Sequence, residues 1–338
     1  MKFYIITNYL NMLPQRTHET DSLDLSNLQK VLNERFECII LSIDELSNNI
    51  LNREIIINNN FFWLCSSQIE PFKHAILDVA YEIQSQGGIL VPKYDFYLSH
   101  ENKYYQEFYK KRCNIETPNA ILITTSLSKP EVKNFPIVSK SYSGFGSNGV
   151  SLIKNKEELV KKIEKYMFSF ISYNIVPYEL IKRLIKIKIK IKYKNKYPKK
   201  IGRVVLQDLI PDLKYDWKLL VFNNNIFALK RYTRDNDFRA SGSGKFDYDC
   251  RPSNELLLFA YNTRKKLDVP FVSLDIVECG LNKFSVIEFQ AVHFGLTTAL
   301  NCNKYYTILE DSSIHVNKEK MSNIESFFSN SIIEYIKN

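Results

Sequence analysis

The chain has 338 residues, 45% of them hydrophobic and 25% charged, a balance typical of a globular protein with two or three modest domains. No apolar run approaches the roughly 18–20 residues that span a bilayer, and the six cysteines form no CxxC pair. These features argue against a transmembrane protein, a zinc ribbon and a disulfide framework, and they favour the reduced cytoplasm. The first ten residues, MKFYIITNYL, are typical of a first strand rather than of a signal peptide.

The formal net charge of +9 comes from one segment, residues 182–200, which carries ten basic residues and no acidic one. The rest of the chain is therefore close to neutral. Because nucleic-acid recognition needs a broad basic face, this pattern argues against that class. Alternating Ile and Lys over 185–192 favours an amphipathic strand, whereas the preceding residues suit a helix. The segment is either a solvated surface projection or an arm that binds an anionic membrane or a polyanion.

The first hundred residues alternate between strand and helix patterns, which predicts an open parallel sheet. Strands are expected near 3–7, 38–43, 61–65 and 88–92, and helices near 25–36 and 70–85. A further helix is expected over 99–112, with Ser99 as its N-cap and Glu101 in its first turn.

The pattern changes after residue 115, where strands dominate. The expected strands lie near 136–140, 150–153 and 203–210, with two more in 217–234 around an Asn-rich turn and two in 271–290 around Cys279–Asn282. Helices are expected near 155–170, 253–267 and 323–338. The chain as a whole is predicted to be an α/β protein.

Glycine is scarce, with only 10 in the chain, and three of them lie within six residues just after Lys140. Backbone N–H groups of such a loop can hold phosphate oxygens while the lysine adds a positive charge. The loop lies between two strands and lacks the GK[ST] helix start, so it is not a P-loop. A plain tight turn explains the glycines equally well.

A second motif places Asp275 and Glu288 on strands that flank one short turn, with Gln290 two residues further on. If the turn centres near Leu281, the two carboxylates lie opposite or diagonal to each other on the same face, within about 4.5–8 Å. Two carboxylates and an amide oxygen suit Mg²⁺ that is held jointly with nucleotide phosphates. The alternative is a pair of solvated strand carboxylates, but their apolar neighbours indicate buried strands.

A third motif is FALKRYTRDNDFRASGSGK, in which Arg231 and Arg239 flank a glycine-containing segment. Two cations there could stabilise negative charge that develops during a phosphoryl or acyl transfer. The acidic residues Asp235 and Asp237 alone would also suit a metal-dependent glycosyltransferase, but that class leaves the upstream lysine and glycine loop unexplained.

Taken in order from Glu101 to Gly295, these motifs resemble the ATP-grasp superfamily, and the DFR segment resembles that of the glutamate-adding ligases. The resemblance implies an N-terminal parallel-sheet domain followed by a two-part ATP-grasp region. The implied boundaries are 1–98 for the N-terminal domain, 99–175 for the subdomain with the glycine loop, 176–202 for the basic arm, and 203–338 for the C-terminal subdomain with hinge and metal site.

The resemblance also implies roles for individual residues. The nucleotide would be bound by two lysines, the glycine loop, an adenine hinge and a ribose carboxylate: Lys103, Lys140, Ser143, Gly144, Gly146, Ser147, Gly149, Gln207, Asp208, Ile210 and Asp216. The catalytic cations would be Arg231 and Arg239. The Mg²⁺ ligands, which would also accept Mn²⁺, would be Asp275, Glu288 and Gln290.

Two departures from the family pattern concern the end of the region. The usual EVN is EFQ here, and the usual SPG is replaced by AVHFG, which leaves the acceptor pocket unassigned. His293 in that stretch either faces the pocket or is a core histidine.

The resemblance implies an ATP-dependent, ADP-forming carboxylate–amine ligase, with small-molecule or glycan substrates such as those of surface-polysaccharide or amino-acid and sugar-acid conjugate synthesis. The polar stretch CSSQ, residues 65–68, follows an N-terminal strand and would bind the carboxylate, or else forms a structural turn. A phosphotransferase of the same fold, a non-catalytic nucleotide-binding protein and a homodimeric assembly remain open.

Overall fold

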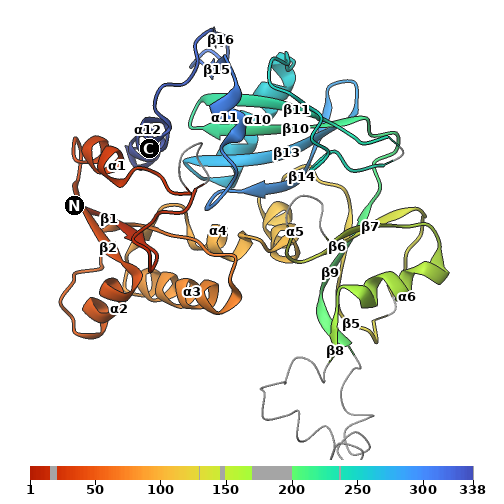
Figure 1. Ribbon diagram of the computed structural model, residues 1–338, viewed down its shortest axis with the longest axis horizontal. Helices are drawn as coiled ribbons and strands as arrows, with labels where there is room; N and C mark the ends of the chain where they lie inside the picture. Colours follow the sequence, from red (N-terminus) through yellow and green to blue (C-terminus); the bar gives the residue numbers. More distant parts are fainter. Residues whose placement is uncertain (16–20, 129, 145–148, 170–199, 236, 338) are drawn as a thin grey trace, which may run out of the picture. The chain divides into compact units, whose positions relative to one another are not determined.

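The computed structural model describes residues 1–15, 21–128, 130–144, 149–169, 200–235 and 237–337 (Figure 1). The chain divides into two compact units. Unit 1 contains Met1–His100, Phe108–Thr117 and Asp212–Asn338, and unit 2 contains Glu101–Glu107 and Pro118–Pro211. Most of the basic arm and its surroundings, residues 170–199, lie outside the described residues. Within the described part, no helix has both the length and the apolar character needed to cross a membrane.

Unit 1 begins with the expected parallel sheet, whose order is β2-β1-β3-β4. Its strands are β1 (Lys2–Thr7), β2 (Glu37–Ser42), β3 (Phe61–Leu64) and β4 (Ile89–Leu90). The helices between them are α1 (Leu25–Leu32), α2 (Ile43–Leu51) and α3 (Glu70–Ser85). Helix α2 was not expected from the pattern. It begins directly after β2 because Ser42 and Glu45 form a capping box there.

The predicted single helix over 99–112 is wrong. Two helices occupy this region, α4 (Tyr94–Ser99) and α5 (Lys103–Arg112). Ser99 is the last residue of α4 rather than the residue before a helix that begins at 100, and its hydroxyl donates to the carbonyl of Asp95. Glu101 has a φ of 47°, which a continuous helix cannot contain, and it therefore lies in the break rather than in a first turn.

The second sheet of unit 1 has seven strands in the order β14-β13-β10-β11-β15-β16, with β12 paired to β11. The strands are β10 (Tyr215–Phe222), β11 (Asn225–Tyr232), β12 (Phe246–Asp247), β13 (Phe271–Gly280), β14 (Lys283–Gln290), β15 (Tyr305–Ile308) and β16 (Ile314–Asn317). The helices are α10 (Asn254–Leu267), α11 (Thr297–Asn301) and α12 (Ile324–Lys337). The two hairpins turn at Asn223 and Asn282, whose φ angles are 50° and 54°. The first lies in the predicted Asn-rich turn, and the second lies within the expected turn around Cys279–Asn282.

Aromatic side chains from both sheets and from α12 form the core of unit 1. The Trp63 ring of β3 lies 5.6 Å from the rings of Phe271 and Phe328, and Phe328 also contacts Phe222 and Phe294. All five side chains are at most 3% exposed. Large aromatic groups contribute much of the apolar area that a core buries. The C-terminal helix therefore joins the two sheets of this unit.

Unit 2 contains a five-stranded antiparallel sheet and helix α6 (Lys156–Lys165). Its strands are β5 (Ala120–Thr125), β6 (Ile137–Ser141), β7 (Val150–Ile153), β8 (Phe168–Ser169) and β9 (Lys200–Asp208). Strand β9 pairs with β5 and β6, so residues up to Pro211 belong to this unit rather than to the C-terminal part expected from 203. The core is aliphatic and includes Ile123, Ile153 and Val204.

Helix α10 gives a stability prediction, because the Ser253 hydroxyl accepts from the Leu256 backbone N–H at its start. Ser253→Ala should lower the free energy of unfolding by about 1 kcal/mol, since the cap is lost. Ser253→Asp keeps an acceptor and should remain within about 0.5 kcal/mol of the parent. Urea unfolding of both variants measures the difference. Equal destabilisation by Ala and Asp would contradict a capping role.

Candidate active site

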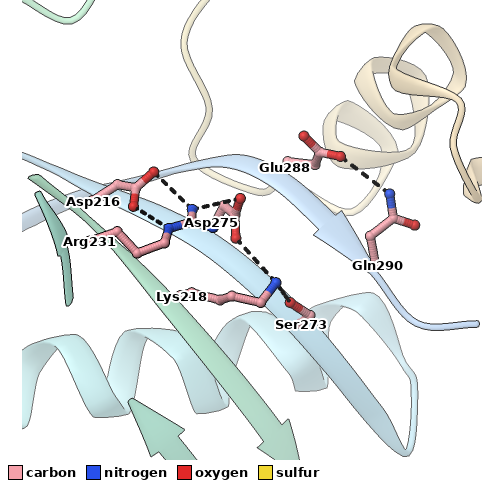
Figure 2. A network of polar contacts seen from close by, with 7 residues as sticks. All are labelled: Asp216, Lys218, Arg231, Ser273, Asp275, Glu288 and Gln290. Atoms are coloured by element: carbon pink, nitrogen blue, oxygen red, sulfur yellow. Dashed lines mark hydrogen bonds and ion pairs between the residues drawn. The ribbon is translucent and has the colours of Figure 1, made fainter. Parts of the chain in front are cut away.

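One face of the seven-stranded sheet gathers the charged side chains of four neighbouring strands (Figure 2). Residues two apart on a strand share a face, and so do residues paired across strands. The register pairs Asp216 with Arg231, Lys218 with Asp275, and Asp275 with Glu288. The sheet therefore brings three carboxylates and two cations together from positions up to 72 residues apart in sequence.

Arg231 is the centre of this group. Its Nε and Nη2 donate to the two carboxylate oxygens of Asp216 at 2.7 and 2.8 Å, and Nη2 lies 2.8 Å from Asp275 Oδ2. Burial opposes the charge of the guanidinium, but Asp275 and Asp216 outweigh it and raise the pKa of Arg231. With Asp216 only 2% exposed and both its oxygens bound to Arg231, the placement favours a role in holding Arg231 over contact with a ribose.

Lys218 is a member of the group that the sequence analysis missed. Its Nζ donates to Ser273 Oγ at 2.9 Å and lies 3.8 Å from Asp275 Oδ1. Burial lowers the pKa of Lys218, with Asp275 acting in the opposite direction. The sequence spacing could have identified Lys218, because a residue two positions after Asp216 lies on the same face of β10.

The predicted metal ligands lie where the hairpin places them. Asp275 and Glu288 are directly opposite each other, and Gln290 lies opposite Ser273 on the same face. The Gln290 amide nitrogen donates to Glu288 Oε1 at 3.3 Å, so the amide oxygen points the other way. The described residues contain no cluster of three or more His, Cys, Asp or Glu that could hold a metal alone. These three side chains can supply oxygen ligands for Mg²⁺, with phosphate oxygens filling the remaining coordination positions. The Gln290 amide would have to rotate by half a turn to direct its oxygen at the ion.

His100 lies beside Gln290, and a second histidine, His293, stacks on it. His100 Nδ1 is 3.3 Å from Gln290 Oε1, and the rings of His100 and His293 are nearly parallel with centroids 6.0 Å apart. Burial lowers the pKa of His100 to about 3 and also lowers that of His293. The segment around His293 is fixed by the Gln15 side chain, which bonds Val292 O and Phe294 N. Neither His100 nor Gln15 was identified from sequence.

Arg239 lies in a different environment from its proposed partner Arg231. Its Nη2 is 2.7 Å from Asp237 Oδ2, and its side chain is 34% exposed, against 7% for Arg231. The contact with Arg239 lowers the pKa of Asp237. Arg231 is thus fixed within the sheet, whereas Arg239 is held by a partly exposed local pair.

Unit 2 brings the two predicted nucleotide lysines close to other predicted residues. Lys140 Nζ donates to Gln207 Oε1 at 2.6 Å across the β6–β9 pair, and Gln207 Nε2 donates to Glu107 Oε1 at 3.4 Å. Lys103 Nζ donates to the carbonyl oxygen of Gly144 at 2.7 Å. Lys103 therefore contacts the start of the glycine loop, and Lys140 contacts a side chain near the end of β9.

The glycine loop is described only at its two ends, and Gly146 and Ser147 lie outside the described residues. Ser143 and Gly144 follow β6, and the backbone N–H of Gly144 lies 3.4 Å from Glu101 Oε2. Gly149 has a φ of 77°, and a Cβ there would lie 2.1 Å from Ser141 Oγ. Only glycine fits that position without a shift.

The predicted adenine hinge lies at the end of unit 2. The backbone N–H of Asp208 donates to the Asn119 carbonyl at 3.0 Å, and Asp208 Oδ2 accepts from Asn119 Nδ2 at 2.9 Å. Ile210 follows the end of β9 and is half-buried. The contacts of Asp208 and Ile210 with a nucleotide stay predictions.

No family model matches the chain, and no curated protein matches it in sequence. Among solved structures, D-cycloserine synthetase DcsG has a TM-score of 0.53 and 11% identity, covering 98% of this chain and 99% of that chain. D-alanine–D-alanine ligase from Bacillus anthracis complexed with ATP has a TM-score of 0.49 and 13% identity, covering 100% and 96%. The RimK domain protein ATP-grasp from Sphaerobacter thermophilus has a TM-score of 0.46 and 11% identity, covering 86% and 92%.

The chain has the ATP-grasp fold, as the order of its motifs predicts.

Arg231 gives a prediction about stability. Arg231→Met leaves the buried Asp216 and the half-buried Asp275 with one counter-charge fewer, so the free energy of unfolding should fall by about 3–5 kcal/mol. Arg251 is exposed and serves as the control, because Arg251→Met should change the free energy of unfolding by less than about 0.5 kcal/mol. Urea unfolding at neutral pH compares the two variants. Similar small effects would show that the ion pairs are not needed for folding.

Proposed function

We propose that this chain is an ATP-dependent carboxylate–amine ligase that releases ADP and phosphate. The observation that carries the proposal is the direct opposition of Asp275 and Glu288 beside Arg231 and Lys218 on one face of the sheet. Such a face combines oxygen ligands for a divalent cation with fixed positive charge, which are the groups that phosphoryl transfer requires. The shared fold supports the same activity class.

The reaction has two steps. A carboxylate oxygen of the first substrate attacks the γ-phosphorus of ATP, which forms an acyl-phosphate and breaks the bond to ADP. The amine of the second substrate then attacks the acyl carbon, and phosphate leaves as the amide bond forms and the amine loses a proton. Both steps build negative charge on oxygen, which fixed cations stabilise.

Each group of residues takes one part in this scheme. Lys103, Lys140 and the glycine loop bind the nucleotide phosphates, and the end of β9 binds the adenine. Arg231, held by Asp216, and Lys218 stabilise the transferring phosphoryl group, with Arg239 contributing from the neighbouring segment. Mg²⁺, or Mn²⁺, bound through Asp275, Glu288 and Gln290 would supply further neutralisation of phosphate charge.

The carboxylate substrate is assigned to unit 1. Ser66 follows β3 at the carboxyl end of the parallel sheet, where ligands of open α/β sheets bind. It is 6% exposed, and its Oγ has no hydrogen-bond partner among the described groups. A buried hydroxyl without a partner favours a ligand contact over a structural turn. Substrates from surface-polysaccharide or conjugate synthesis, and a cytoplasmic location, remain part of the proposal.

The activity is tested by incubating the protein with Mg-ATP and paired panels of carboxylic acids and amines, with ADP release and product mass as readouts. A conjugate with one ADP per bond formed is the expected result. A stable phosphorylated acid without conjugate would instead identify a phosphotransferase. Absence of acceptor-dependent ADP release would contradict both activities.

Glu288→Gln tests the metal site. The substitution keeps size but removes one charge, so turnover should fall on the order of 100-fold or more while the melting temperature changes little. Isothermal titration with Mg-ATP should show weaker binding, and the loss should be partly offset at higher Mg²⁺ concentration. A variant with the parent's turnover and Mg²⁺ dependence would remove Glu288 from the site.

Gln290 gives a graded comparison at the same site. Gln290→Asn retains an amide oxygen and should keep substantial activity, whereas Gln290→Leu has no ligand and should lose most of it. Mg²⁺ titrations of ADP release measure both. Equal activity of the Asn and Leu variants would exclude the amide from metal binding.

A further inference from the structure

Arg203 of β9 is a cation that the scheme above does not use. Its Cζ lies 4.1 Å from the centroid of the Tyr142 ring, which directly follows β6. The side chain is half-buried, and within the described part of the chain no carboxylate or carbonyl accepts from its guanidinium. A guanidinium carries five N–H donors and is costly to bury without acceptors, so these donors indicate a place for an anion.

The alternation of β9 places Arg203 on the same face as the proposed nucleotide contacts of unit 2. Lys140 of β6 donates to Gln207 of β9 at 2.6 Å. Arg203 lies four residues before Gln207, and residues an even number apart on a strand share a face. The alternate residues, Val204 and Leu206, belong to the aliphatic core on the other side of the sheet. Arg203 is therefore a further cation on the face that carries Lys140.

The position of Arg203 along β9 corresponds to the phosphate end of a bound nucleotide. The proposed adenine contacts begin at Asp208, five residues after Arg203 and so roughly 16 Å away along the strand. At the other end, the backbone N–H of Tyr142 donates to the Arg203 carbonyl at 3.1 Å. Tyr142 directly precedes Ser143, where the proposed phosphate-binding loop begins. Because the adenine and the last phosphate lie at opposite ends of ATP, Arg203 lies on the side of the phosphates.

Lys103 lies at the same end of the strands. Its backbone N–H donates to the Tyr142 carbonyl at 2.8 Å, and its Nζ donates to the Gly144 carbonyl at 2.7 Å. Glu101 is also here, but its Oε2 lies 3.4 Å from the backbone N–H of Gly144 and forms no ion pair with Arg203. Two positively charged side chains therefore flank Tyr142 at the described start of the loop. Such a pair suits a ligand that carries several negative charges.

We propose that Arg203 binds the terminal phosphates of the nucleotide, with the Tyr142 ring holding its guanidinium in place. The proposal rests on the proposed function, in which unit 2 binds ATP. Contact with the face of an aromatic ring uses none of the N–H groups, which lie in the plane of the guanidinium and can pair with two phosphate oxygens. A purely structural contact between Arg203 and Tyr142 would stabilise this end of β9 but would not respond to the number of phosphates.

The test compares the dissociation constants of AMP, ADP and a non-hydrolysable ATP analogue for the full-length protein, measured by NMR titration with Mg²⁺. Arg203→Met should weaken binding of the analogue about tenfold or more and binding of AMP less than about twofold, because a charge-assisted contact acts only on the phosphates that it reaches. Lys161→Met removes one positive charge from an exposed position of α6 and serves as the control. It should change each constant by less than about twofold.

Two more substitutions separate charge from geometry. Arg203→Lys keeps the charge but lacks the planar fork of donors, so it should restore part of the lost affinity for the analogue. Arg203→Gln removes the charge but keeps a polar side chain, and it replaces Arg203→Met in the comparison if the Met variant is unfolded at the assay temperature. Unchanged analogue binding in a folded neutral variant, or equal weakening of AMP and the analogue, would overturn the proposal.

The outcome is separable from that of the ligase assay. Nucleotide binding is measured without an acid or an amine, so a phosphate-dependent loss in a protein that shows no acceptor-dependent ADP release would contradict the ligase and leave the role of Arg203 standing. Conversely, ADP release by the parent with unchanged analogue affinity in Arg203→Met would support the ligase and overturn the role of Arg203. A parent that binds none of the three nucleotides would contradict both.

Discussion

The buried ion pair of Arg231 with Asp216 and Asp275 is the interaction on which the candidate site depends. Removing charges from water is unfavourable unless partners of opposite charge replace the solvent. Here one guanidinium binds carboxylates from two different strands, at 2.7–2.8 Å. The three strands can satisfy these groups only in the observed register, because a shift by one residue would turn each charge to the other face. The ion pair therefore fixes both the sheet and the positions of its charges.

The same register places the charged side chains on one face of the sheet and the apolar core side chains on the other. On β10 and β13 the charged positions alternate with Leu219, Leu274 and Ile276, which are fully buried. Apolar side chains on one face hold the sheet against its own core, so the other face can carry lysine, arginine and carboxylates. Groups that are fixed before a substrate arrives need no reorganisation when charge develops, which is the main electrostatic advantage of such a site.

The two units use different means to place their cations. In unit 1, Lys218 lies in a partly buried network and its position follows from strand pairing. In unit 2, Lys103 and Lys140 bond to a loop carbonyl and to a side-chain amide, groups that a phosphate can replace as partners. The proposed division between fixed catalytic charge and exchangeable nucleotide contacts follows from these environments.

The sequence by itself determined features that depend on neighbours along the chain. Period-two and helical patterns predicted the parallel sheet and the paired hairpins. A turn expected near Leu281 placed Asp275 opposite or diagonal to Glu288, and the structure shows direct opposition. Only the tertiary structure decided the break between α4 and α5, the role of Lys218, and the position of His100 beside Gln290. His100 and Gln290 are 190 residues apart, so no local pattern connects them. Such contacts arise from packing many elements at once, and a single sequence carries no periodic signal for them.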